Sequence, residues 1–220
     1  MSKALSILEN EVQVVALLFM AAVYTLRLVW LFRFRSAPER TYAAGSAAAG
    51  VAWSMLNVAM PWAMESTRRK PFFYVQFVIF HIGVVLAIGA TFIIPYWPEL
   101  FEVAPVVRTV QVALGAACAV GLMRLYRRLT TPALRLISTK DDYFSLTLMI
   151  VFFFAGVVAT ATRPADGEWP LIAFFALTAF FLVYVPFSKI CHYLYYPFTR
   201  FYFGRMQGHR GVVAKSRRLP

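Results

Sequence analysis

Five apolar segments alternate with shorter polar stretches along the 220 residues of the chain. A helix needs about 20 mainly apolar residues to cross a bilayer, and each of these segments is about that long. The pattern predicts an all-α integral membrane protein with five transmembrane helices, over residues 11–32, 71–94, 106–126, 143–162 and 169–196. Residues 1–197 would form one transmembrane bundle, and residues 198–220 would form a basic cytoplasmic tail.

The long connection between the first two spans is the ambiguous part of this pattern. Its middle, residues 43–64, is rich in alanine and moderately apolar, but Gly and Pro interrupt it and basic residues flank it. We expect an interfacial or re-entrant helix in a cytoplasmic loop. A true span is the alternative, which would reverse the sides of half of the chain and give a worse charge pattern.

The charge pattern gives the orientation. The formal net charge is +12, and on the five-span topology eighteen Lys and Arg lie on one face against Lys3, Arg108 and Arg163 on the other. Because positive loops stay in the cytoplasm, we expect the N-terminus outside and the C-terminus inside. The basic residues sit beside apolar segments without a motif that reads nucleic acid, so we expect a multi-pass protein of the bacterial inner membrane and no nucleic-acid partner.

One histidine stands out in the second span. Residues 71–94 contain no Asp, Glu, Lys or Arg, but they include His81. An unpaired polar group in hydrocarbon costs on the order of several kcal/mol, so an intramembrane histidine is a functional candidate. His192 lies near the end of the last span, and two histidines from two helices suggest the axial ligands of a haem b. Hydrogen bonds to neighbouring helices are the alternative for both.

Other residues near these histidines fit the same interpretation. Gly83 and Gly89 remove bulk beside His81, as a flat macrocycle would require. Three polar side chains near the expected level of the haem are candidate contacts of a haem propionate or a quinone: Arg27, Gln76 and Lys189. For the two cations the alternative is snorkelling to the interface, and for the amide it is a hydrogen bond between helices.

The remaining polar and sulfur residues have simpler expected roles. A basic loop contributes four arginines: Arg124, Arg127, Arg128 and Arg135. They would pair with haem propionates or with an acidic partner, or they would only mark the cytoplasmic side of the membrane. Cys118 and Cys191 form no CxxC pair and are expected to be small buried residues. His209, in the polar stretch MQGHRG, is expected to be solvated.

Three stretches of the chain resemble the gamma, or cytochrome b, subunit of respiratory nitrate reductases. They are FHIG at 80–83 with the helix that follows it to PYWPE, RLISTKDDYFSLTLMIVFFFAGV at 135–157, and VPFSKICHYLYYPFTRFYFGR at 185–205. The short chain and the long first cytoplasmic loop are more similar to the cytochrome b-like subunit of the high-molecular-weight cytochrome c transmembrane complex of sulfate-reducing bacteria.

The resemblance implies a function and a set of partners. Members of the family bind haem b, exchange electrons with a quinol (menaquinone or ubiquinone), and pass them to a cytoplasmic iron–sulfur subunit, here one resembling that of heterodisulfide reductase. Other membrane subunits would complete the complex. His81 and His192 match the ligands of the haem nearer the cytoplasm, whereas Thr91 and Phe174 stand where the other pair would be. The resemblance therefore implies a single haem.

The sequence thus predicts an electron-transfer subunit that is not catalytic alone, because it shows no catalytic triad, phosphate loop or carboxylate pair. The alternative is a haem-free membrane anchor that docks a soluble redox partner through its basic face. A small transporter is a weaker reading, since no inverted repeat or acidic intramembrane residue is evident.

Overall fold

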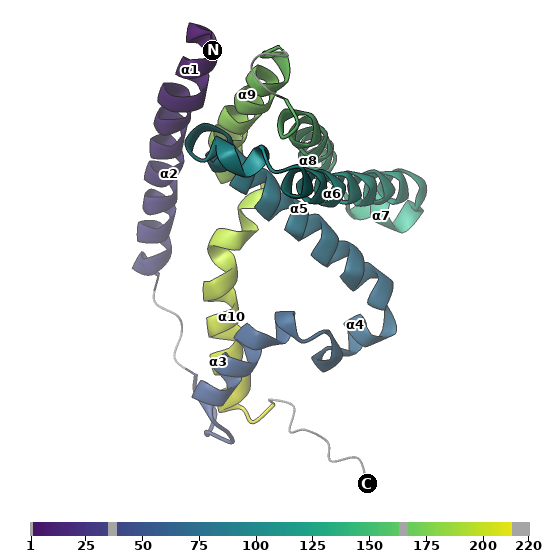
Figure 1. Ribbon diagram of the computed structural model, residues 1–220. Coiled ribbons are helices and arrows are strands. Elements are labelled where there is room, and N and C mark those ends of the chain that lie inside the picture. Colours follow the sequence, from purple (N-terminus) through teal and green to yellow (C-terminus); the bar gives the residue numbers. More distant parts are fainter. Residues whose placement is uncertain (1, 35–38, 163–166, 213–220) are drawn as a thin grey trace. The chain divides into compact units, whose positions relative to one another are not determined.

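A computed structural model of the chain describes residues 2–34, 39–162 and 167–212. Over these residues the chain is helical and contains no strand, which confirms the predicted class (Figure 1). Five of the described helices are long and apolar enough to cross a membrane, as a multi-pass membrane protein requires: Lys3–Arg33, Pro71–Tyr96, Ala104–Thr130, Lys140–Ala159 and Trp169–Phe187.

The chain divides into two compact units. Unit 1 comprises Met1–Thr25 and Val75–Ile190, and unit 2 comprises Leu26–Tyr74 and Cys191–Pro220. The helices of unit 1 are α1 (Lys3–Ile7), the π-helical segment η1 (Leu8–Val12), the first part of α2 (Gln13–Arg33), most of α5 (Pro71–Tyr96), η4 (Pro98–Phe101), α6 (Ala104–Thr130), α7 (Pro132–Ile137), α8 (Lys140–Ala159), α9 (Trp169–Tyr184), η6 (Val185–Phe187) and the start of η7 (Lys189–Cys191). Unit 2 holds the rest of α2, α3 (Ala47–Leu56), η2 (Asn57–Ala59), η3 (Pro61–Ala63), α4 (Glu65–Arg69), the start of α5 and α10 (His192–His209).

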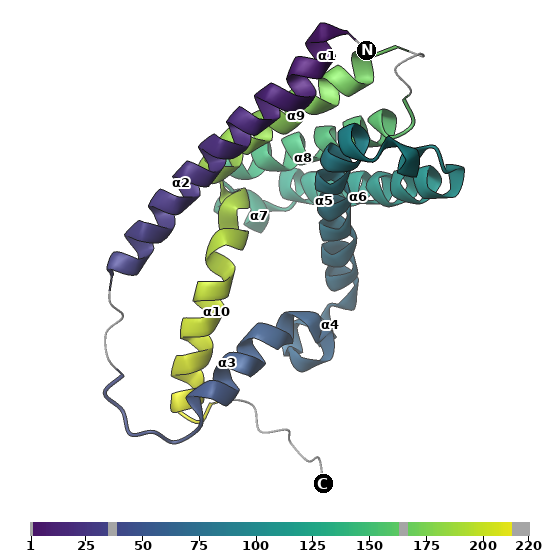
Figure 2. The ribbon, with the colours of Figure 1, turned by 60° about the vertical axis from the view of Figure 1, so that its left-hand side comes forward.

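Large aromatic side chains fill the core of unit 1, where α8 packs against both α6 and α9 (Figure 2). Phe153 of α8 and Phe174 and Phe175 of α9 are fully buried. Phe152 stacks on Phe174, with ring centroids 5.2 Å apart and planes only 4° from parallel. Phe174 therefore serves as a core residue.

Helix α5 approaches α6 closely at Gly83. A Cβ atom on Gly83 would overlap the Cβ of Ala117 and lie 3.4 Å from the ring of Phe153. The absence of a side chain at Gly83 thus lets two helices touch, and our interpretation of this glycine as room for a macrocycle is wrong. A Cβ on Gly89, in contrast, would meet no heavy atom of the described residues within 4 Å.

The last predicted span is interrupted. Helix α9 ends at Tyr184, and two 3₁₀ turns with an extended Ser188 between them separate it from α10. Pro186 explains the break, because proline lacks the N–H that would continue the helix and clashes with the preceding turn. The continuous helix predicted over residues 169–196 is therefore wrong at its C-terminal end.

Helix α10 also continues through Pro197, where we expected it to stop, and it ends at His209. A proline inside a helix costs one backbone hydrogen bond, yet α10 continues beyond it and packs on α3. Residues 198–209 are thus part of a packed helix and not of a tail. The basic residues Lys215, Arg217 and Arg218 lie outside the described residues, as do Arg35 and Arg163.

Glycines bring α3 and α10 of unit 2 together. A Cβ on Gly50 would overlap the backbone of Gly204 and lie 2.5 Å from the Cα of Gly208. At the two ends of the contact, Gly208 meets Ser46 and Gly204 meets Ser54, so the helices run antiparallel (Figures 1 and 2). This is the small-residue spacing that allows two helix backbones to touch in membrane proteins.

Polar contacts complete the α3–α10 pair. Arg200 donates hydrogen bonds from Nε to the carbonyl of Ser54 (2.9 Å) and from Nη2 to Oδ1 of Asn57 (2.8 Å). At the other end, the His209 ring lies 2.8 Å from the carbonyl oxygen of Thr41. His209 is therefore the last residue of a helix and not part of a tail, and its ring ties the end of α10 to the chain before α3 through a hydrogen bond that stays exposed to solvent.

Candidate functional site

His81 lies in the first half of α5, and its imidazole is oriented by its own helix. Nδ1 is 2.7 Å from the backbone oxygen of Phe77, and the ring packs against the Phe77 ring with centroids 4.0 Å apart. A carbonyl oxygen only accepts hydrogen bonds, so Nδ1 carries a proton, and in the neutral ring Nε2 then carries the lone pair. A fixed tautomer of this kind is typical of histidines that bind a metal through the other nitrogen.

Two side chains of α6 contact this part of α5: the cation Arg124, and Met123, which accepts from the amide of Gln76. The guanidinium of Arg124 lies 5.1 Å from the ring centroid of Phe80, the residue before His81. Gln76, only 2% exposed, places Nε2 3.2 Å from Sδ of Met123. A positive charge therefore lies within about one helical turn of His81 along α5, where an anionic group of a ligand would be stabilised.

His192 is the first residue of α10 and is exposed. It follows the interrupted segment directly, and the preceding Cys191 is buried. His81 belongs to unit 1 and His192 to unit 2, so the pairing of the two histidines stays a prediction.

Arg27 and Lys189 both contact other protein groups. Arg27 donates from Nη1 to the hydroxyl of Tyr195, at 3.0 Å, and both residues belong to unit 2. Lys189 donates from Nζ to Oδ2 of Asp142, at 2.6 Å. Any contact of these cations with a propionate or a quinone would share or replace these bonds.

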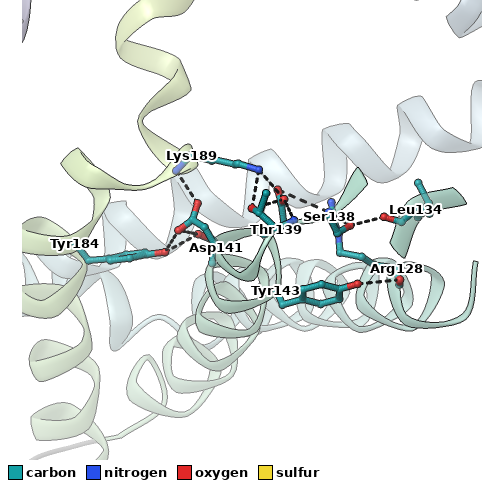
Figure 3. A network of polar contacts seen from close by, with 10 residues as sticks. Arg128, Leu134, Ser138, Thr139, Asp141, Tyr143, Tyr184 and Lys189 are labelled. Atoms are coloured by element: carbon teal, nitrogen blue, oxygen red, sulfur yellow. Dashed lines mark hydrogen bonds and ion pairs between the residues drawn. The ribbon is translucent and has the colours of Figure 1, made fainter. Parts of the chain in front are cut away.

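A polar network that our sequence analysis missed surrounds Lys189 (Figure 3). Oδ2 of Asp142 accepts hydrogen bonds from the backbone N–H (2.7 Å) and hydroxyl (2.8 Å) of Thr139, which caps the start of α8. The ammonium of Lys189 also reaches the Thr139 hydroxyl at 2.9 Å, and Nη1 of Arg128 lies 3.7 Å from the other Asp142 oxygen. One carboxylate thus contacts the last turn of α6, caps the start of α8 and binds Lys189.

The neighbouring carboxylate belongs to the same network. Asp141 accepts hydrogen bonds from the backbone N–H of Lys189 (3.0 Å) and from the hydroxyl of Tyr184 (2.5 Å), which itself lies 2.8 Å from the hydroxyl of Ser145. The signal available in the sequence was the spacing Thr139-x-x-Asp142, which is the acidic form of a capping box. Nothing in the local pattern indicated that these carboxylates would meet Lys189.

Neither cysteine contributes a metal site in the structure. Cys118 and Cys191 are free thiols, half-buried and buried. Within residues 2–34, 39–162 and 167–212, no three His, Cys, Asp or Glu side chains gather as a metal-binding group. A haem needs only two axial ligands, so it does not depend on such a group.

The chain is similar to a curated protein of Nitratidesulfovibrio vulgaris whose name, "Protein", states no activity. The two are 28% identical over 155 residues, which cover 69% of this chain and 68% of that protein. No protein-family model matches the chain, and no solved structure matches it.

Proposed function

We propose that this chain is the membrane haem b subunit of a respiratory redox complex. It would transfer electrons between a pool of menaquinone or ubiquinone and a cytoplasmic iron–sulfur subunit that resembles the one of heterodisulfide reductase. The resemblance of residues 80–83, 135–157 and 185–205 to the cytochrome b family supports this proposal. The observation that carries it is the hydrogen bond from His81 Nδ1 to the Phe77 carbonyl, which leaves Nε2 as the basic nitrogen of the ring.

The residues that are present fit the donor set of a haem. His81 and His192 would be the axial ligands, and the bound haem would supply a centre that accepts and donates one electron at a time. The Phe77 carbonyl would fix the His81 ring and raise the basicity of Nε2. Arg124, which lies over Phe80, would stabilise a propionate by its positive charge.

The proposed orientation has the N-terminus outside and unit 2 at the cytoplasmic face of a bacterial inner membrane. Unit 2 contains thirteen of the 22 Lys and Arg residues but only two of the ten Asp and Glu residues. Helix α3 has ten residues, which rise about 15 Å, half the thickness of a hydrocarbon core of about 30 Å. Tyr193, Tyr202 and Phe203 of α10 are exposed, as aromatic residues in an interfacial helix are. These features support an interfacial position for α3, beneath the iron–sulfur partner.

A single haem near the cytoplasm would set where the quinone binds. With Thr91 and Phe174 in place of the outer ligands, the outer half of this chain would hold no redox centre. The quinone would therefore meet this subunit in the inner half. Gln76 and Arg27 stay our candidates for its polar contacts, and each would exchange its present partner, Met123 or Tyr195, for a quinone oxygen.

The proposal is tested by the absorption spectrum of the purified chain. We expect one low-spin haem b per chain in a pyridine haemochrome assay, and we expect His81→Ala or His192→Ala to abolish the low-spin spectrum. His209→Ala is the matched control, since it removes the third histidine, which contacts Thr41, and should keep the haem. A normal spectrum in either ligand variant, or two haems per chain, would contradict the assignment.

The alternative function is a haem-free membrane anchor, and the charge of unit 2 is the observation that favours it. A surface this basic would dock an acidic protein without any cofactor. This alternative would be established if the purified chain showed no haem in its spectrum and bound the iron–sulfur subunit in a salt-dependent manner.

A further inference from the structure

Lys189 is held at two separate points by the start of α8. Its ammonium bonds to Oδ2 of Asp142 at 2.6 Å, and its backbone N–H bonds to Oδ2 of Asp141 at 3.0 Å (Figure 3). A side-chain contact alone would leave the backbone free to move, because a lysine side chain has four rotatable bonds. The second bond acts on the main chain itself and fixes where the chain leaves the turn after α9.

Both carboxylates also accept hydrogen bonds from groups other than Lys189, and these bonds fix their positions. Thr139 donates two hydrogen bonds to Asp142, whose side chain is only 17% exposed. Tyr184 donates to Asp141. Fixed acceptors lose little conformational entropy when they bind a donor, so such a contact is stiffer than a pair of mobile surface charges.

We propose that Asp141, Asp142 and Lys189 form a clamp that positions His192 as a haem ligand. Lys189 precedes His192 by three residues, within the interruption between α9 and α10. Without a continuous helix through this segment, the intrahelical hydrogen bonds that would otherwise hold His192 in register with α9 are missing. The clamp replaces them with bonds to α8. This inference rests on the proposed function, because it assigns the three residues as positioning residues for a ligand proposed there.

The test compares variants of the full chain in lipid nanodiscs. Lys189→Met and Asp142→Asn each remove the charged contact, and Lys189→Arg restores a cation that can reach Asp142. The control is Lys140→Met, which removes a charge of the same sign from an exposed position beside the same carboxylates. The readouts are the amount of haem per folded chain, the g values of the low-spin haem, which depend on the orientation of its two axial rings, and its midpoint potential.

We expect Lys189→Met and Asp142→Asn to shift the g values and the midpoint potential in the same direction and to weaken haem binding about tenfold, as loss of an outer-sphere partner does. The double variant should show no more than the larger single effect, because both changes break one contact. Lys189→Arg and Lys140→Met should keep the wild-type spectrum. If Lys189 instead touched the haem or the quinone directly, Asp142→Asn would leave the spectrum unchanged and the clamp would be refuted.

The possible outcomes separate this inference from the proposed function. In one outcome the wild-type chain binds haem, and the Lys189→Met and Asp142→Asn variants unfold at lower temperature but keep the g values and the midpoint potential. The contact would then be an ordinary stabilising ion pair. That result would overturn the clamp and leave the proposed function intact. Wild-type chain that binds no haem would overturn both.

Discussion

Two helix contacts of this protein, α8 with α9 in unit 1 and α3 with α10 in unit 2, are built by opposite means. Large aromatic rings fill the contact of α8 with α9, where Phe152 stacks on the fully buried Phe174. In unit 2 the backbones of α3 and α10 meet directly at Gly50, Gly204 and Gly208. The charges differ as well: unit 1 has nine basic and eight acidic residues, whereas unit 2 has thirteen and two.

The comparison shows which changes each unit tolerates. A contact made of large side chains is weakened when a side chain is lost, because a cavity remains. A contact made of glycines is weakened when a side chain is added, because no space exists for it. The two contacts should therefore respond in opposite directions to the same kind of substitution.

The largest effect is expected from the loss of a ring in unit 1. Phe174→Ala would leave a cavity beside Phe152 and Phe175 and should cost about 3–5 kcal/mol of stability, as large-to-small changes of buried Phe do. Hydrogen exchange followed by mass spectrometry should show faster exchange in α8 and α9 and little change in α3. Equal loss of protection in α3 would show that the two units do not respond separately.

A smaller effect is expected from the addition of a methyl group in unit 2. Gly50→Ala places a Cβ against the backbone of α10 and should cost about 1–3 kcal/mol, with faster exchange in α3 and α10 but not in α8. Gly115→Ala is the matched control, because a Cβ there meets no heavy atom of the described residues within 4 Å. In that variant the higher helix propensity of alanine should give about 1 kcal/mol of stabilisation. A neutral Gly50→Ala variant would contradict the close contact of α3 and α10.

The smallest effect concerns an exposed carboxylate in unit 2. Hydrogen bonds from Thr41, and then the interaction with Arg210, hold the pKa of Glu39 below its ordinary value of 4.5. Because this pKa is lower in the folded chain than in the unfolded chain, the stabilisation is present above the unfolded value and is lost as the pH falls through the folded one. Exchange near the end of α10, compared between pH 7 and pH 3 after correction for the intrinsic rate, should reveal a small loss of protection. Glu39→Gln should remove this pH dependence, and an unchanged dependence in that variant would assign it to other groups.

The sequence alone was sufficient for the membrane-spanning helices. Their signal is the length of an apolar run, which is a local property, so α5 was predicted at residues 71–94 and extends over 71–96. The same local signal identified His81 as an ionisable group in an apolar helix. The local signal failed at two prolines of the last span. It predicted a continuous helix through Pro186, which breaks the helix, and an end at Pro197, which lies inside α10. The residue type is the same at both positions, so the identity of the residue alone does not tell a helix break from a proline inside a helix.

Only the tertiary structure decided how distant segments use their small and charged residues. Gly83 was read as space for a ligand, but it lies against Ala117, 34 positions later in the chain. The carboxylates of Asp141 and Asp142 lie in the first turn of α8, and they also bind Lys189, nearly 50 residues away. Hydrophobic length is set by neighbours along the chain, whereas the partner of a glycine or a carboxylate is set by which helices pack together. That second choice depends on the whole folded chain.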